Sequence, residues 1–145
     1  MNRIEATLMA LVGLALALSL ALMLLSADWW MRLNSLHIPD ARVGQDIPIV
    51  YDREFLRNFT GEWAVNVWKM ERGDWQPFCA ADGKWNYEAR KPAPGQDLAW
   101  ITNGAPGCED LPPGEYRVTV NVTANPGRLL SRTASVESNV FKVMP

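Results

Sequence analysis

The chain has 145 residues, enough for one small domain, and its 14 Lys and Arg nearly balance its 16 Asp and Glu. From residue 41 onward, 12 basic residues face 13 acidic ones without forming a basic stripe, which excludes nucleic-acid binding driven by charge. The single histidine, His37, also excludes catalytic sets that need a histidine from the part of the chain beyond it.

The N-terminal segment is long and apolar. Residues 6–27 contain no charge, and nine of them are leucine. As a helix they measure about 33 Å, whereas the hydrocarbon core of a bilayer is about 30 Å thick. A signal peptide usually has a shorter apolar region and a small-x-small cleavage site; here each small pair is followed by large apolar residues. We therefore expect a retained transmembrane helix behind a cytoplasmic tail of residues 1–5, with a cleaved signal as the alternative.

The next segment, residues 28–46, is predicted to connect the membrane to a domain. Trp29 and Trp30 directly follow the apolar run and suit the headgroup layer, where tryptophan is enriched. Trp29, Leu33 and Leu36 have helical spacing, so we expect the helix to continue past the membrane until Pro39.

Residues 47–145 have the pattern of a β domain. Alternation is clearest in 62–70, with Trp63, Val65 and Val67 on one face, and in 115–123. Weaker strand patterns cover 47–52, 75–79, 84–89, 97–102 and 137–143. Turn residues lie at 72–74, 81–83, 92–95, 103–104, 112–114 and 125–127. About seven short strands predict an antiparallel immunoglobulin-like β-sandwich.

The two cysteines, Cys79 and Cys108, both lie in this domain. An even number of cysteines in a small exported domain usually indicates a disulfide, which here closes a loop of about 30 residues and stabilises by roughly 3.5 kcal/mol. A disulfide places the domain outside the cytoplasm and the N-terminus inside. Two buried thiols, or a two-cysteine metal site without histidine, are the alternatives.

The segment 111–118 contains Leu111, Pro113, Gly114 and Tyr116 in the order Leu-Pro-Pro-Gly-Glu-Tyr-Arg-Val. It resembles the Leu-x-Pro-Gly-x-Tyr corner of fibronectin-III-like and bacterial immunoglobulin-like sandwiches. The resemblance implies a penultimate strand at Tyr116, a last strand through 138–141, and a tyrosine hydroxyl bonded to the upstream backbone. In antibody domains a cysteine follows this tyrosine by two residues, whereas Cys108 precedes it, so the disulfide is expected to tie a loop to a strand.

The order of motifs along the chain adds a wider resemblance. An N-terminal span is followed by Gly-Glu-Trp at 61–63, Phe-Cys at 78–79, Cys108, the corner, and Ser-Asn-Val-Phe at 138–141. This order is similar to that of small single-span proteins of unknown function encoded by tailed bacteriophages and prophages. The resemblance implies a bacterial inner-membrane protein with a periplasmic C-terminal domain, and it names no reaction.

Carboxylates are the remaining candidates for chemistry. Two carboxylates can flank a glycosidic bond and cleave it. A calcium site could be formed by Asp82, Glu109 and Asp110. They lie in or beside turns, however, where acidic residues are usually solvated, and no ligand loop is present. We therefore expect no enzyme, no cofactor and no metal site.

Aromatic residues give the best prediction of a binding surface. Trp63 shares its face with two valines and is predicted to lie in the core, whereas Trp68, Trp75, Trp85 and Tyr87 are predicted to line one exposed sheet face. The alternative is that most of them fill a small core. The predicted function is a membrane-anchored, periplasm-facing module that binds an envelope protein, and the alternative is a module that binds peptidoglycan or surface polysaccharide.

Overall fold

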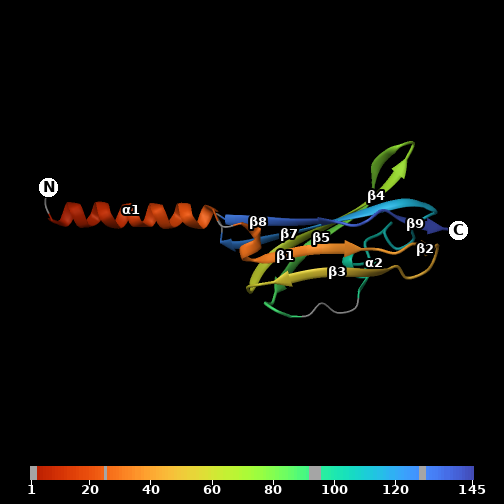
Figure 1. Cartoon of the computed structure of the whole chain (residues 1–145), viewed down its shortest axis with the longest axis horizontal. Helices are drawn as coiled ribbons and strands as arrows, with labels where there is room; N and C mark the ends of the chain where they lie inside the picture. The colour runs from red at the N-terminus through yellow and green to blue at the C-terminus, as the bar shows by residue number, and fades with distance from the viewer. Residues whose placement is uncertain (1–2, 25, 92–95, 128–129) are drawn as a thin grey trace.

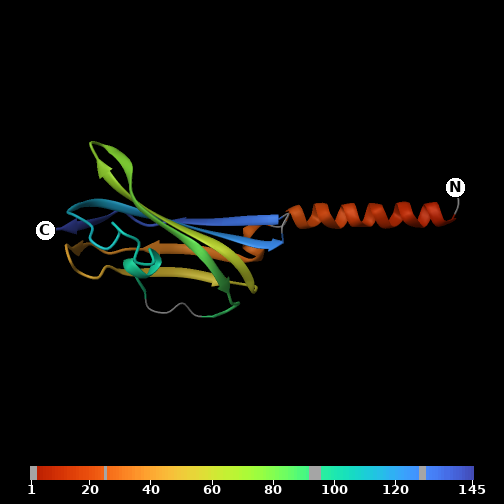
Figure 2. The same ribbon diagram turned by 180° about the vertical axis from the view of Figure 1, so that it is seen from behind.

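A long apolar helix and two β-sheets make up the protein in the computed structural model (Figure 1). The structure describes residues 3–24, 26–91, 96–127 and 130–145. Helix α1 (Arg3–Leu24) stands apart from the sheets in both opposite views, and none of its Ile4–Ala21 segment is buried (Figure 2). Its length and composition suffice to cross a membrane, as predicted.

The β domain begins almost directly after this helix, at strand β1 (Met31–His37), behind the short 3-10 helix η1 (Ala27–Trp29). The expectation that the helix continues to Pro39 is therefore wrong, and part of the predicted connector 28–46 belongs to the β domain. Met31 and Ile38 are fully buried in the domain core. A β-bulge between Leu33 and Ser35 inserts an extra residue into β1, so its inward-facing residues acquire a spacing of three that resembles a helix.

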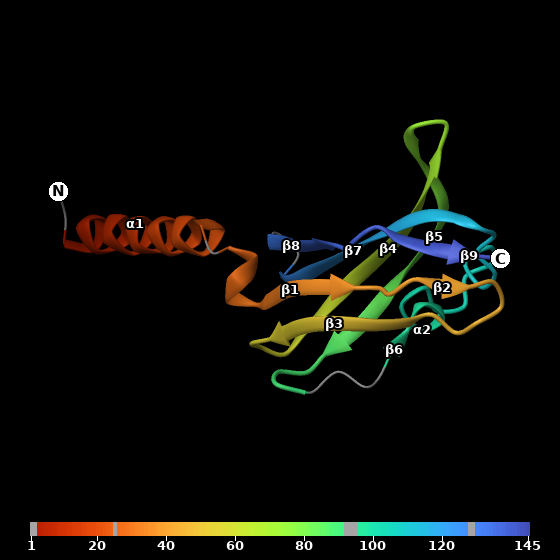
Figure 3. The same cartoon turned by 45° about the vertical axis from the view of Figure 1, so that its right-hand side comes forward.

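Two sheets face each other across this core (Figure 3). The smaller sheet has the order β1-β3-β6, with β3 at Pro48–Phe55 and β6 at Gln96–Asp97. The larger sheet has the order β2-β9-β7-β4-β5, and β8 also pairs with β7. Its strands are β2 (Ala41–Arg42), β4 (Phe59–Glu71), β5 (Asp74–Tyr87), β7 (Gly114–Gly127), β8 (Leu130–Glu137) and β9 (Phe141–Met144). The larger sheet is mixed, because β2 pairs with β9 in parallel, so the prediction of a purely antiparallel fold needs this correction.

The two clearest predicted strands are confirmed as the centre of the larger sheet. β4 and β7 are antiparallel, with Val65 opposite Val120 and Val67 opposite Val118. All four valines are at most 3% exposed. The period of two in the sequence therefore marks the buried face correctly.

The turn at 72–74 is confirmed, and the turn at 81–83 is wrong. Arg72 and Gly73 both have positive φ, 54° and 91°, which is the type I′ geometry of a two-residue hairpin between β4 and β5. By contrast, Gly83 lies inside β5, opposite Trp63. A Cβ atom on Gly83 would come within 2.8 Å of the Trp63 ring, so this glycine permits close packing of an indole rather than a turn.

The strand predicted at 97–102 is wrong, because residues Leu98–Ile101 form helix α2. The Asp97 carboxylate accepts a hydrogen bond from the Trp100 backbone N–H at 2.7 Å and caps this helix. The strand predicted at 137–143 is split into the end of β8 and the start of β9. β8 itself was missed, residues 125–127 belong to β7, and the turn predicted at 92–95 lies outside the described residues.

The tyrosine corner is present at the start of β7. The Tyr116 hydroxyl donates a hydrogen bond to the Pro112 carbonyl at 2.6 Å, and the side chain is fully buried. Its ring lies 5.9 Å from the Phe141 ring and 5.6 Å from the Phe78 ring. This corner fixes the entry of β7 into the core.

We predict that Tyr116→Phe lowers the free energy of unfolding by about 1 to 2 kcal/mol, because it leaves the Pro112 carbonyl without its donor. Urea unfolding of the full chain in detergent measures this loss. Tyr87→Phe is the matched control, since no hydrogen bond of the Tyr87 hydroxyl is seen among the described residues. Equal unfolding midpoints for the two variants would contradict the prediction.

Candidate functional site

The two sheets leave a groove of about 650 Å³ between them on the side of β5. β5 is the last strand of the larger sheet, and the groove lies between this strand, β3 of the smaller sheet and residues 99–104. Aromatic and apolar side chains make up most of its lining, and we call it the aromatic groove. Its lining residues are Tyr51, Arg53, Phe55, Trp63, Val65, Trp85, Asn86, Tyr87, Glu88, Lys91, Ala99, Trp100, Ile101, Asn103, Gly104, Val120 and Val122.

Strand alternation positions the two walls of the groove. On β3, the inward-facing positions are Tyr51, Arg53 and Phe55, separated by exposed residues. On β5, Trp85 and Tyr87 face the same interior. The groove therefore forms where the core face of each sheet extends beyond the part that the other sheet covers.

Arg53 is the unusual residue of the aromatic groove, because a cation occupies an inward-facing strand position. Its guanidinium carbon lies 4.9 Å from the centre of the Tyr51 ring, 5.3 Å from that of Phe55 and 5.2 Å from that of Trp100. These distances are those of cation–π contacts. Among the described residues, no carboxylate forms an ion pair with Arg53, and its buried Nε atom has no hydrogen-bond partner. The groove thus holds a positive charge that faces aromatic rings and the Tyr51 hydroxyl, with no carboxylate of the described residues paired to it.

The tyrosines beside Arg53 are held in their neutral form. Burial raises the pKa of the Tyr51 hydroxyl, and the nearby Arg53 charge opposes part of that rise. Burial likewise raises the pKa of Tyr87 to about 12. The buried Tyr51 hydroxyl interacts with the Arg53 guanidinium beside it. A ligand with an acceptor or a negative charge would supply a partner for the Arg53 Nε atom, which has none among the described residues.

The predicted binding surface is divided between two faces. Trp85 and Tyr87 line the aromatic groove, but only Trp85 is exposed, at 65% of its surface. Tyr87 is 7% exposed and stacks on Phe59, with ring centres 4.8 Å apart, so it forms a wall of the groove. Trp68 and Trp75 do not line this groove. A bulge in β5 at Phe78 shifts the alternation by one residue, which puts Trp75 on the opposite face from Trp85.

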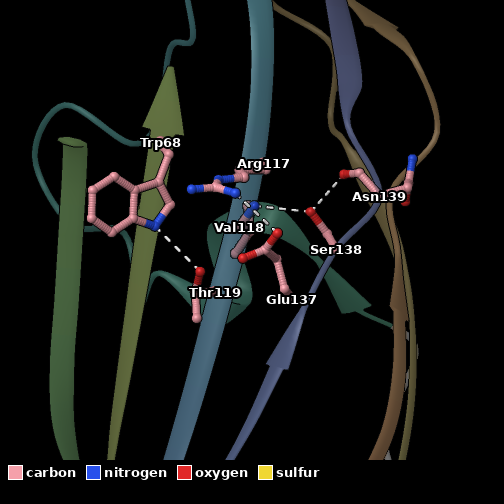
Figure 4. A network of polar contacts seen from close by, with 7 residues as sticks. All are labelled: Trp68, Arg117, Val118, Thr119, Glu137, Ser138 and Asn139. Atoms are coloured by element: carbon pink, nitrogen blue, oxygen red, sulfur yellow. Dashed lines mark hydrogen bonds and ion pairs between the residues drawn. The ribbon is translucent and has the colours of Figure 1, made fainter. Parts of the chain in front are cut away.

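On that outer face, Trp68 and Trp75 pack around Arg117. Figure 4 shows Trp68 and Arg117. The Arg117 guanidinium lies 4.6 Å from the centre of the Trp75 ring and donates to the Glu137 carboxylate at 3.1 Å. The Trp68 indole N–H donates to the Thr119 hydroxyl at 3.2 Å (Figure 4). Both tryptophans are half-buried, the Trp68 N–H already has a partner within the protein, and the Arg117 guanidinium between them is paired with Glu137. They are therefore a poorer binding surface than the groove.

The disulfide predicted from the sequence joins Cys79 and Cys108, with Cα atoms 5.6 Å apart. It connects β5 to the loop that follows α2, as the resemblance implied. Because Trp100 and Asn103 lie on α2 and the start of this loop, the bond restrains one end of the groove against β5. Trp29 and Trp30 lie at the junction of α1 with the domain; Trp29 is 44% exposed, and the Trp30 ring packs 6.3 Å from that of Phe59.

The groove and its cation were missed from the sequence. The strand predicted at 47–52 ends one residue before Arg53, and α2 was expected to be a strand. The available signal was the alternation of Ile49, Tyr51, Arg53 and Phe55, in which an arginine takes an apolar position. Among the described residues, no group of three or more His, Cys, Asp or Glu side chains is placed to hold a metal ion.

No family model, curated protein or solved structure matches the chain.

We predict that the three tyrosines of the chain resist ionisation in the folded protein. The pKa of Tyr116 is also raised by burial to about 12, as is that of Tyr87, whereas an unfolded tyrosine ionises near 10. Because the pKa values are raised in the folded state, the stability that comes from keeping these tyrosines neutral is fully present below about pH 10. It is lost as the pH rises toward 12. Absorbance at 295 nm, recorded against pH in buffer and in urea, measures both states. Reversible ionisation of folded protein near pH 10 would contradict the prediction.

Gly83→Val is expected to displace the Trp63 indole from the β5 backbone and to destabilise the protein by about 1 to 3 kcal/mol. The same substitution at the neighbouring exposed residue, Asp82→Val, serves as the control and is expected to cost less than about 0.5 kcal/mol. Urea unfolding with tryptophan fluorescence measures both. If the two variants are equally stable, the packing role of Gly83 is wrong.

Proposed function

We propose that the protein is a membrane-anchored binding module of the bacterial envelope. Helix α1 serves as a signal anchor in the inner membrane, with the N-terminus in the cytoplasm and the β domain in the periplasm. The length and composition of α1 support the anchor. The Cys79–Cys108 bond supports the orientation, because structural disulfides persist in oxidising compartments outside the cytoplasm.

The domain is proposed to be an immunoglobulin-like sandwich from a phage or prophage protein. Two facing sheets and the bond from Tyr116 to the Pro112 carbonyl support the sandwich type. The phage origin is supported only by the resemblance in motif order described above. This class of domain presents binding surfaces in many proteins, so it suits the proposed module.

The aromatic groove is the observation on which the binding function depends. β5 offers 14 residues as an edge strand, hydrogen-bonded on one side to β4. An extended segment of an envelope protein that pairs with this edge would place alternate side chains over Trp85 and into the groove. Aromatic or acidic side chains of that segment would meet the indole faces and the Arg53 guanidinium.

A specific feature also favours the second candidate, a glycan. Trp85 and Trp100 are 65% and 45% exposed and both line the groove. Sugar rings stack their apolar faces on indoles, and the acidic groups of peptidoglycan would complement Arg53. We rank this second because the exposed sheet edge offers backbone hydrogen bonds to a peptide along its whole length.

A photo-crosslinking experiment in intact bacteria tests the proposed function. p-Benzoylphenylalanine is placed at Trp85 in the groove and, as the control, at Trp68 on the outer face. We expect crosslinks to an envelope protein from position 85, lost when Arg53→Met is added, and none from position 68. In parallel, the full chain in detergent is sedimented with purified murein, with Trp85→Ala and the exposed β3 variant Val50→Ala as a pair.

Murein binding lost in Trp85→Ala but kept in Val50→Ala would favour the glycan. If position 85 gives no crosslink and the protein does not bind murein, the groove is not the functional site. Because Trp85 is largely exposed, its replacement is expected to change stability by less than about 0.5 kcal/mol, so lost binding is not a folding effect.

A further inference from the structure

The helix and the β domain are joined almost without a linker. Helix α1 ends at Leu24 and β1 begins at Met31, and η1 takes up part of the short stretch between them. The Trp30 carbonyl already accepts a hydrogen bond from the Leu56 backbone N–H at 2.9 Å. The near end of the domain therefore lies against the headgroup layer whenever α1 spans a bilayer.

We call this end the base of the domain, defined by Trp29, Arg57, Arg90 and Lys91. Arg57 lies over the Trp29 ring, with its guanidinium carbon 4.1 Å from the ring centre. The Arg90 backbone N–H donates to the Phe55 carbonyl at 2.9 Å, which holds the segment after β5 at the same end. Figures 1 and 3 show the β3–β4 loop and the end of β5 on the side of the domain nearest α1.

The base has a small excess of positive charge, because the one exposed carboxylate of η1, Asp28, offsets only one of the two exposed arginines of the base. Arg57 and Arg90 are exposed, and neither forms an ion pair with a carboxylate among the described residues. Lys91 pairs with Glu88 at 3.2 Å, so this pair is neutral. The opposite end of the domain has exposed carboxylates at Asp74, Glu109 and Asp110, which outnumber the exposed Arg72 beside Asp74. The domain therefore has a more positive end and a more negative end, although its total charge is close to zero.

We propose that the base binds the phosphates of anionic phospholipids in the leaflet from which α1 emerges. Arg57 and Arg90 supply guanidinium groups within reach of the phosphates, and the exposed Trp29 ring suits the interface. The acidic far end is repelled by the same surface, so both ends favour one orientation. This inference rests on the proposed anchoring by α1.

Docking of the base also orients the aromatic groove. Glu88 and Lys91 line the groove at the base, and Asn103 and Gly104 line it near the far end. A domain standing on its base therefore holds the groove along the membrane normal, and its ligand would reach from the bilayer surface into the periplasm.

Hydrogen–deuterium exchange of the full chain in lipid nanodiscs tests this proposal. Nanodiscs of phosphatidylcholine are compared with nanodiscs that also contain about 30% phosphatidylglycerol, an anionic lipid. We expect amide exchange in residues 56–58 and 88–91 to slow by about threefold or more in the anionic discs. The protection should disappear in about 0.5 M NaCl, where screening is strong. Exchange at the hairpin residues 71–74 should be the same in both lipids.

The variant with Arg57→Glu and Arg90→Glu is expected to lose the protection, whereas Arg72→Glu at the far hairpin is expected to keep it. Equal exchange in both lipids, or protection that survives the double substitution, overturns the lipid contact. Alkaline carbonate extraction is done on the same samples. A chain released by carbonate overturns the anchor and this inference together; a chain that stays in the discs with equal exchange overturns this inference alone.

Discussion

The pairing of β4 with β7 is the contact on which the rest of the domain depends. It places Val65 against Val120 and Val67 against Val118 on one buried face. β5 then adds to the free side of β4, and β8 and β9 add to β7. The smaller sheet covers only part of the apolar face made in this way. The uncovered part, beside β5, is the aromatic groove, so the candidate site follows from an incomplete overlap of two sheets.

Two bulges decide which residues face that interior. The bulge in β1 turns Met31, Leu36 and Ile38 inward and makes the strand part of the core. Trp75 and Trp85 are an even number of positions apart, so they would share one face of a regular strand. The bulge in β5 places them on opposite faces. Each bulge is a single extra residue, but it reverses the face of every residue beyond it because side chains alternate along a strand. This is why tryptophans close in sequence serve different surfaces.

The position of Arg53 links stability to the proposed binding. A half-buried cation without a carboxylate partner costs free energy, and three aromatic rings offset part of that cost. The Arg53 Nε atom, which has no hydrogen-bond partner among the described residues, adds to that cost. The position of Arg53 is therefore consistent with a ligand that supplies the missing partner. The short junction to α1 then determines which end of the domain lies nearest that helix.

The apolar helix, the two central strands and the disulfide partners were predictable from the sequence, because each depends on composition or on short-range period. The corner tyrosine was implied by the resemblance of residues 111–118 to a known sandwich motif. The local predictions that were wrong rest on patterns that two different structures can produce. Gly83 lies in an Ala-Asp-Gly sequence typical of turns, but it packs under Trp63 within a strand. Leu33 and Leu36 have helical spacing because a bulge lies between them. The union of Arg53, Trp85 and Trp100 in one groove was decided only by tertiary structure. These residues come from β3, β5 and α2, and no local pattern in the chain encodes how far one sheet covers the other.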